Sequence, residues 1–283
     1  MLISNAPCSW GVSYPTGNAV GWVQYLDEVA AAGYRGTELG PFGYLPKDPA
    51  VVDEHLAARN LTVVGATHVH TFPDATTLPN LLADLREEGA ILNSLGARNL
   101  VIMDEDAWYP EGRKGELEAS GWRTLVDGVE TARKVIEEEL GLKASFHPHV
   151  GTGVQFEAQI DRLLDESDID LCFDTGHHAF WNQDALAYFS KVRERVAYVH
   201  LKNVDSRVRQ RVLDGTLSIG RSYAEGVMCP LPDGVVDIPA VIRFMRETAF
   251  DGPVVVEQDL AENGTETPLA LARRNLDFIN QVM

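Results

Sequence analysis

The chain has 283 residues, of which 45% are apolar and 23% are charged, so it can bury a full core as one large α/β domain or as two small ones. Its 42 acidic and 24 basic residues give a formal charge of −18, which argues against nucleic acid as a partner because phosphate backbones favour basic patches. Three scattered cysteines, no signal-peptide pattern and no apolar run near the roughly 20 residues that span a bilayer predict a cytoplasmic protein without a membrane partner.

Short apolar runs alternate with amphipathic helical patterns along the whole chain. The runs are rich in β-branched or small apolar residues and end in polar ones, as strands covered on both faces do. The predicted strands are 2–7, 36–40, 62–68, 99–104, 143–147, 170–175, 196–201 and 253–258. The predicted helices are 21–33, 49–59, 79–95, 121–140, 155–166, 183–192, 237–248 and 268–281. Asp237 and Thr267 are the expected N-caps of the last two helices.

Eight strands that alternate with helices over this length predict a single (β/α)8 TIM barrel that spans residues 1–283. A doubly wound open sheet is the alternative, but it normally carries a glycine-rich phosphate turn, and no GxGxxG or Walker A pattern is present. Two stretches, 104–120 and 205–236, are longer than ordinary connections. Loops of that length are usually functional lids or disordered segments.

Histidines gather where the predicted strands end, which is where a barrel carries its active site. Only His55 lies inside a predicted helix. The seven others fall in or just after strand ends, and they are His68, His70, His147, His149, His177, His178 and His200. Glu38, Asp174 and Glu257 end strands as well. The pattern therefore predicts a functional site at this rim.

Four of these residues are spaced as barrel repeats. His147, Asp174 and His200 follow one another at 27 and 26 residues, about one β/α unit each, and Glu257 follows after 57, one unit enlarged by the long loop. They are thus expected on strands five to eight, adjacent around one rim. Alone, each has an ordinary structural interpretation, such as a helix N-cap for Asp174. Together, two imidazoles and two carboxylates suit Mn²⁺, Co²⁺, Fe²⁺ or Zn²⁺ in an open site.

Six motifs are distributed along the chain: "GYRGTELGPFGYLPKDP" (33–49), "FHPHVGTGVQ" (146–155), "CFDTGHHAF" (172–180), "YVHLKNVD" (198–205), "LPDGVVDIPAVI" (231–242) and "VVVEQD" (254–259). They resemble motifs of the xylose-isomerase-like barrel superfamily, which includes sugar epimerases, endonuclease IV and inosose dehydratases. The resemblance extends over nearly the whole chain and is closest to the inosose dehydratases, which take part in inositol catabolism. It implies a divalent metal cofactor, first Mn²⁺ or Co²⁺ and then Zn²⁺, Fe²⁺ or Mg²⁺, and a keto-polyol or keto-sugar substrate. Barrels of this superfamily often associate, so a homo-oligomer is left open.

The superfamily's metal ligands are typically Glu, Asp, His and Glu from the last four strands. Carried over, Asp174, His200 and Glu257 match, whereas His147 stands where the first glutamate is expected. In the superfamily's ketose epimerases, two metal-bound glutamates act on opposite faces of the substrate carbon. The exchange leaves one such carboxylate here. A lyase needs one base, a metal that holds the enolate and an acid for the departing hydroxyl, so the sequence favours elimination.

Other positions acquire expected roles from the same resemblance. His149 matches the histidine that follows the first ligand, His177 matches a substrate-contacting histidine, and Lys202 follows His200 on the same strand face. With Glu257 they are the catalytic candidates, because imidazoles titrate near neutral pH and serve as acid or base. Independently of the resemblance, Glu38 and His68, on predicted strands two and three, are expected to hydrogen-bond substrate hydroxyls across the pocket, and Trp10 and Phe42 are expected to supply an apolar wall.

Three other functions remain open at this point. A sugar or keto-polyol isomerase or epimerase is the nearest, and a lyase that acts on 3-keto-glycosides is chemically close. A non-catalytic carbohydrate-binding barrel is the alternative of a different class. A nuclease like endonuclease IV would need more metal ligands and a basic face, against a charge of −18.

Overall fold

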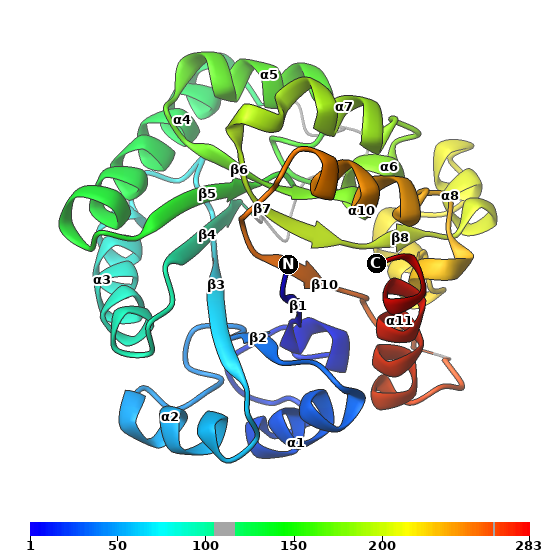
Figure 1. The fold of residues 1–283 in the computed structure, drawn as a ribbon. Helices are drawn as coiled ribbons and strands as arrows, with labels where there is room; N and C mark the ends of the chain where they lie inside the picture. Colours follow the sequence, from blue (N-terminus) through cyan, green and yellow to red (C-terminus); the bar gives the residue numbers. More distant parts are fainter. Residues whose placement is uncertain (105–116, 263) are drawn as a thin grey trace.

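The computed structural model describes residues 1–104, 117–262 and 264–283. Eight parallel strands close into a barrel in the order β1-β10-β7-β6-β5-β4-β3-β2, which confirms the predicted (β/α)8 fold (Figure 1). The strands are β1 (Ile3–Asn5), β2 (Gly36–Glu38), β3 (Thr62–His70), β4 (Asn99–Asp104), β5 (Lys143–His147), β6 (Asp170–Asp174), β7 (Val196–Leu201) and β10 (Val254–Val256). Among the described residues, no helix is long and apolar enough to cross a membrane.

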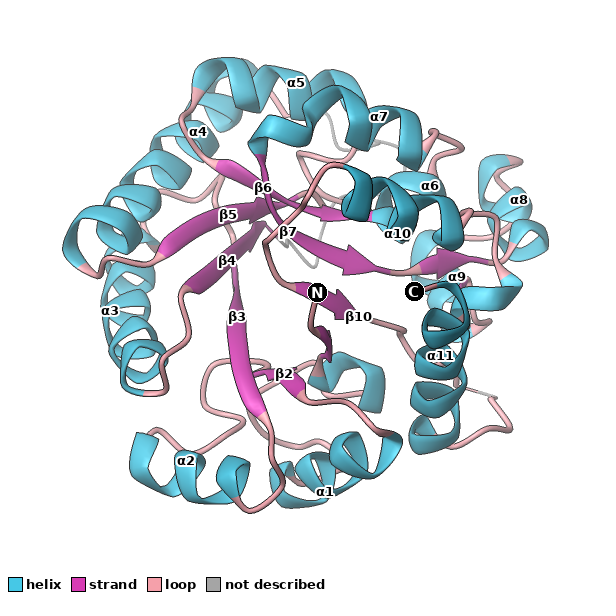
Figure 2. Cartoon of the chain, viewed as in Figure 1, coloured by secondary structure: helices cyan, strands magenta, loops and turns pink. Residues whose placement is uncertain are grey.

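Helices surround the barrel, and each predicted helix is present (Figure 2). They are α1 (Trp22–Ala32), α2 (Pro49–Ala57), α3 (Leu78–Ser94), α4 (Ala119–Lys134) continued by the π-helix η2 (Val135–Glu139), α5 (Glu157–Glu166), α7 (Ala185–Val192), α10 (Ile238–Glu247) and α11 (Pro268–Val282). Asp237 and Thr267 cap α10 and α11, where their side chains accept hydrogen bonds from Ala240 and Ala270. Both caps were predicted, and each is followed by a proline in the first helical turn.

Strand alternation divides the apolar side chains between two layers. In β7, Val199 and Leu201 belong to the main core between strands and helices, whereas Tyr198 packs inside the barrel with Val101 and Cys172. Gly65 makes room for this tyrosine, because a Cβ there would lie 3.1 Å from the Tyr198 hydroxyl. Tyr198 therefore lies inside the barrel, and His200, two residues later, points to the same side of β7.

The connection from β7 to α10, expected to be a lid or a disordered loop, is ordered in the structure. It contains β8 (Asn203–Val204), α8 (Ser206–Leu213), α9 (Ile219–Ala224), β9 (Met228–Cys229) and η4 (Leu231–Asp233), with β8 and β9 paired antiparallel. Of these elements, β8, α8, α9 and β9 pack on a second apolar cluster that includes Val150 and Phe180, whereas Leu231 of η4 belongs to the main core. The disordered alternative was wrong because this small core supports the segment, and the lid alternative stays a prediction. The other long stretch, 104–120, lies mostly outside the described residues.

Three further short helices were not predicted: η1 (Pro7–Trp10), α6 (Thr175–Phe180) and η3 (Arg193–Arg195). The first two directly follow β1 and β6, at the end of the barrel where the strands finish. Of these, α6 matters most for the site, because it begins beside Asp174 and contains His177.

Candidate metal centre

The structure brings the four predicted ligands together. His147 and Asp174 end their strands, His200 is the penultimate residue of β7, and Glu257 directly follows β10. Register pairs Asp174 with His200 across neighbouring strands. One ligand atom from each residue lies within 4.8 Å of the others, and all four residues are buried. This set could hold a metal ion, and it is called the rim cluster below.

The two oxygens of Asp174 have different surroundings. Oδ1 accepts hydrogen bonds from the amides of Gly176 and His177, both at 2.8 Å, and so caps α6. Oδ2 is buried without a hydrogen-bond partner and lies 3.7 Å from His147 Nε2 and 3.8 Å from His200 Nδ1. One carboxylate therefore caps the helix and also offers an oxygen to the rim cluster.

Hydrogen bonds engage one nitrogen of each imidazole and leave the other nitrogen facing the rim cluster. His147 Nδ1 lies 2.8 Å from the carbonyl of Pro148, which can only accept, so Nδ1 carries the proton and Nε2 the lone pair. His200 uses Nε2 for another partner, and its buried Nδ1 has no hydrogen bond and lies 3.4 Å from Glu257 Oε2. His147 Nε2 and His200 Nδ1 thus both face carboxylate oxygens. A cation at their centre satisfies all of them, and the donor set fits a divalent transition metal.

Electrostatics agree with a cation site. Burial raises the pKa of Asp174 to about 6, although Lys202 and His200 oppose the change. Burial and the charge of His200 hold the pKa of His147 well below its usual value. For Glu257, burial is outweighed by His200 and Lys202, which hold its pKa well below the usual range. A metal ion would therefore find neutral His147 and ionised Glu257 ready to bind.

His200 behaves differently in the metal-free site. Burial lowers its pKa, but Cys172 and Glu257 outweigh burial and raise the pKa well above its usual value. The metal-free protein therefore keeps a proton on this ring, and the proton supplies the positive charge between the carboxylates. Metal binding at Nδ1 must displace that proton.

The three predicted proton-transfer groups flank the rim cluster. The rings of His149 and His177 stand 4.0 Å apart, and that of His177 is 5.2 Å from His147. Lys202 is buried, and its Nζ lies 3.0 Å from His177 Nε2 and 3.1 Å from Glu257 Oε2. A side chain at Gly176 would come within 2.7 Å of Lys202, so the glycine of the "DTGH" motif leaves space for the lysine.

Asp259 is a member of this site that sequence reasoning missed. Its Oδ2 lies 3.1 Å from Lys202 Nζ, which also lies 3.1 Å from Glu257 Oε2. The signal that could have found it is its position two residues after Glu257, just past the end of β10.

The predicted substrate contacts have other partners in the structure. Glu38 does reach the cluster, where its oxygens accept hydrogen bonds from protein donors. His68 pairs with Ile102 on the outward face of β3, and its Nδ1 bonds Glu88 of α3 at 2.8 Å. The indole of buried Trp10 donates to Glu28 at 2.7 Å. The predicted substrate contacts of His68 and Trp10 stay predictions.

Phe42 lies beside the ring of His68, with centroids 6.0 Å apart, and Lys47 Nζ sits 4.1 Å from the centre of its ring. Its predicted role as an apolar wall stays a prediction. Two other rim histidines have packing roles. His178 stacks on Tyr188 at 4.8 Å, on the side of α6 away from the rim cluster, and His70 bonds the hydroxyl of Thr77 at 2.9 Å.

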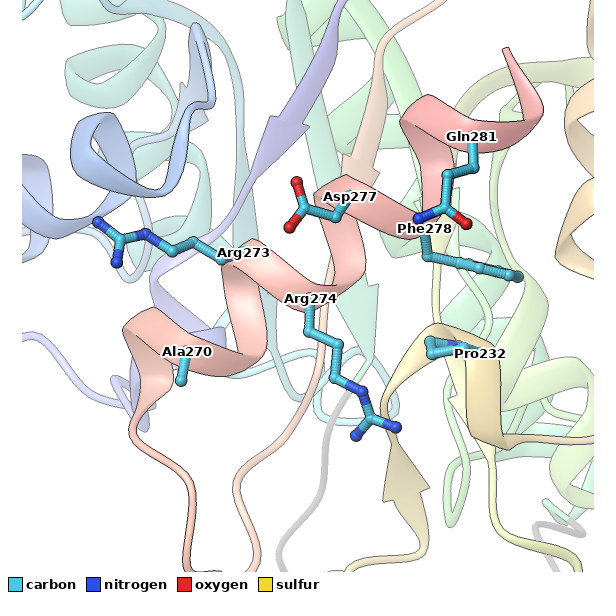
Figure 3. A pocket seen from close by; sticks show the side chains of 7 residues that line it. All are labelled: Pro232, Ala270, Arg273, Arg274, Asp277, Phe278 and Gln281. Carbon is cyan, nitrogen blue, oxygen red and sulfur yellow. The ribbon is translucent and has the colours of Figure 1, made fainter.

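A surface depression of about 580 Å³ lies between η4 and α11, separate from the rim cluster (Figure 3). Its lining residues are Pro232, Ala270, Arg273, Arg274, Asp277, Phe278 and Gln281. Arg274 binds Asp233 at 2.7 Å, and Arg273 donates to the carbonyl of Ala31 at 3.1 Å. Since both guanidinium groups already have partners, this depression is not a candidate for the site.

A closed β/α barrel with two histidines and two carboxylates at its rim defines the class of barrel enzymes with a metal centre. The chain belongs to the xylose isomerase-like TIM barrel family, whose model matches residues 26–282. It is 30% identical to the inosose dehydratase of Clostridium beijerinckii over 250 residues, 83% of this chain and 81% of the relative.

Two solved structures share the fold over nearly the whole chain. The probable 3-DHS dehydratase AsbF from Bacillus anthracis has a TM-score of 0.76 at 14% identity, with 99% of this chain and 100% of that one covered. The IOLI protein with a binding zinc atom has a TM-score of 0.75 at 13% identity, with 100% and 98% covered. At these identities the similarity establishes the fold alone.

Proposed function

We propose that this protein is a metal-dependent carbon–oxygen lyase that eliminates water from an inosose-type keto-cyclitol. The observation that carries the proposal is the rim cluster, in which His147 Nε2 and His200 Nδ1 face carboxylate oxygens, and buried Asp174 Oδ2 and His200 Nδ1 have no hydrogen-bond partner. The similarity to inosose dehydratases over most of the chain supports the choice of substrate.

The residues that would hold the metal are His147 through Nε2, Asp174 through Oδ2, His200 through Nδ1 and Glu257 through a carboxylate oxygen. Mn²⁺ or Co²⁺ suits this mixed nitrogen and oxygen set best. Zn²⁺ and Fe²⁺ are next, and Mg²⁺ is the least suited because it prefers oxygen ligands. When bound, the ion polarises the ketone and stabilises negative charge on its oxygen, an effect worth several kcal/mol.

His149 is proposed as the base. Its Nδ1 lies 3.0 Å from the carbonyl of Val150, so the neutral ring carries its lone pair on Nε2. It is also half-buried, whereas His147 and His177 are buried. As the α C–H bond breaks, Nε2 takes the proton and the electron pair passes into the enolate.

Lys202 is proposed as the acid. Burial lowers its pKa, but Asp259 and Glu257 outweigh burial and raise the pKa well above its usual value, so the side chain is an ammonium at neutral pH. As the β C–O bond breaks, the enolate electron pair forms the Cα–Cβ double bond, and the hydroxyl takes a proton from Nζ and leaves as water. His177, which contacts Lys202 and whose ring centroid lies 4.0 Å from that of His149, would pass protons between them. Glu257 would hold Lys202 in place besides binding the metal.

The test is to strip the protein with a chelator and then restore Mn²⁺ or Co²⁺ while following the absorbance of the dione formed from a keto-inositol. Activity should vanish and return with the metal. Elimination that persists without metal would overturn the mechanism, and metal-dependent isomerisation without loss of water would identify an epimerase. A panel of keto-inositols, ketoses and 3-keto-glycosides would separate the substrate classes.

A further inference from the structure

We infer that Glu38 is a positioning residue that strengthens metal binding through His200, in place of the substrate contact expected from the sequence. The inference rests on the proposed function, because it assumes that the rim cluster binds a metal. It concerns a residue of β2, on the far side of the barrel from the ligand that it orients.

Glu38 is surrounded by donors inside the barrel. Its Oε1 accepts from the Tyr198 hydroxyl at 2.8 Å and from His200 Nε2 at 3.0 Å. Its Oε2 accepts from the hydroxyl of Thr67 at 3.2 Å. The Glu38 side chain is 2% exposed and that of His200 is fully buried, so water does not compete for the bond between them. Both oxygens of Glu38 are therefore already engaged within the protein.

The hydrogen bond decides which nitrogen of His200 can bind a metal. A carboxylate only accepts, so His200 Nε2 must carry a proton. Metal must then bind at Nδ1, which lies 3.4 Å from Glu257 Oε2 and 3.8 Å from Asp174 Oδ2. A carboxylate behind a ligating imidazole also makes the ring a stronger donor to the metal, and losing such a partner typically weakens binding 10–100-fold.

The backbone is adjusted to allow this contact. In the barrel, β2 is separated from β7 by β1 and β10, so Glu38 reaches His200 across the interior. The register between β2 and β3 shifts between Thr37 and Glu38, which pairs Glu38 with Gly65. Gly65 in turn leaves space for the Tyr198 ring. A local irregularity and a glycine thus place the carboxylate where Tyr198 and His200 both meet it.

A second buried pair of the same chemistry supplies a matched control. Glu88 of α3 is fully buried, and its Oε2 lies 2.8 Å from His68 Nδ1. This pair lies on the outward side of β3, between strand and helix, and its residues are not part of the rim cluster. Loss of a charged partner has similar structural consequences at both sites, but only Glu38 contacts a proposed ligand.

The experiment compares wild type, Glu38→Gln and Glu88→Gln after each has been stripped of metal. Calorimetric titration with Mn²⁺ and Co²⁺ measures the dissociation constants, and thermal unfolding measures the rise in Tm on adding metal. Glu38→Gln should bind each ion about 10–100-fold more weakly than wild type, and its Tm should rise less on adding metal. Glu88→Gln should bind as wild type does, even where its metal-free Tm is lower.

Equal affinity in wild type and Glu38→Gln would overturn the inference, as would equal weakening in both variants. A wild type that binds no metal would overturn both this inference and the proposed function. Metal binding that weakens as expected, in a protein that eliminates no water, would support the role of Glu38 and overturn the proposed reaction alone.

A measurement on the wild type covers the case in which Glu38→Gln does not fold. In the Zn²⁺-loaded protein, nitrogen-15 NMR of the histidine rings should show His200 protonated at Nε2 and metal-bound at Nδ1. The reverse assignment would overturn the inference, because a ring bound through Nε2 cannot donate from that atom to Glu38.

Discussion

The carboxylate of Asp174, a proposed metal ligand, caps α6, the helix that contains the proposed proton-transfer group His177. Oδ1 accepts from the amide of His177 at 2.8 Å, and Oδ2 lies 3.8 Å from His177 Nε2. The turn from β6 into α6 is thus anchored at the rim cluster. Asp174 therefore sets the position of His177 relative to the proposed metal site.

Two substitutions of Asp174 separate its two functions. Asp174→Asn should keep the cap of α6, because asparagine is as good an N-cap as aspartate. Its metal affinity should fall by more than about 100-fold, because losing a residue that only hydrogen-bonds to a ligand already weakens binding by up to that factor. Asp174→Ala should lose the affinity and the cap, so its unfolding free energy in chelator should lie about 1 kcal/mol below that of Asp174→Asn. Calorimetry and denaturant unfolding measure the two effects. Equal unfolding free energies would contradict the capping role.

The proton-transfer assignment predicts a loss of rate without a loss of metal. His149→Asn and His177→Asn should each lower kcat about 10²–10⁴-fold, the usual contribution of a general acid or base, and leave the metal dissociation constant nearly unchanged. Steady-state kinetics and calorimetry check both quantities. His178→Asn is the control, because His178 packs on Tyr188 away from the rim cluster and should keep the wild-type kcat while it is folded. Loss of metal in His149→Asn would instead make His149 a ligand.

Most of the barrel could be predicted because its strands are short apolar runs at regular spacing, and all eight are present. The insertion after β7 could not be predicted, because the local pattern of its helix α8 is misleading. In α8, Arg207, Arg209 and Arg211 alternate with other residues, a pattern typical of a strand or loop, and the helix is fixed by the Asp205 cap. Its apolar residues face a small core formed partly by distant segments, which the sequence of the insertion does not reveal.

The composition of the rim cluster was predictable because parallel strands in a barrel end at one rim, so repeat spacing becomes adjacency. The direction of each side chain was harder to predict. Glu38 and His68 both looked like strand ends, but β3 continues to His70, and Thr67 is the residue that turns toward Glu38. Alternation then directs His68 outward to Glu88. Which face of a strand lines the interior depends on its register with the neighbouring strands. The register shift beside Glu38 cannot be read from the alternation of apolar and polar residues in the sequence.

Metal should stabilise the protein more at neutral than at acidic pH. The folded-state pKa of Asp174, about 6, lies above its ordinary value of 3.8, so this group favours folding below pH 4 and loses that contribution as the pH rises through 6. The cost of the buried carboxylate at neutral pH is about 3 kcal/mol. Metal binds the ionised form and offsets that cost, so the rise in Tm with Mn²⁺ should be larger at pH 7.5 than at pH 5. The raised pKa of His200 acts in the same direction. A rise independent of pH would contradict this account.

The exchange of histidine for glutamate at position 147 can be reversed. His147→Glu should keep a metal, because glutamate supplies an oxygen in place of Nε2, but it places a second carboxylate opposite Glu257 and adds a negative charge to a cluster that already holds Asp174. Water elimination from a keto-inositol should fall at least about tenfold relative to exchange of the α-proton, because a second base can return a proton before the hydroxyl leaves. Proton NMR in deuterated water follows both processes in one sample. His147→Asn is the control, since it removes the ligand without supplying a carboxylate and should weaken metal binding. A His147→Glu protein that eliminates water as readily as wild type would show that this position does not decide between elimination and epimerisation.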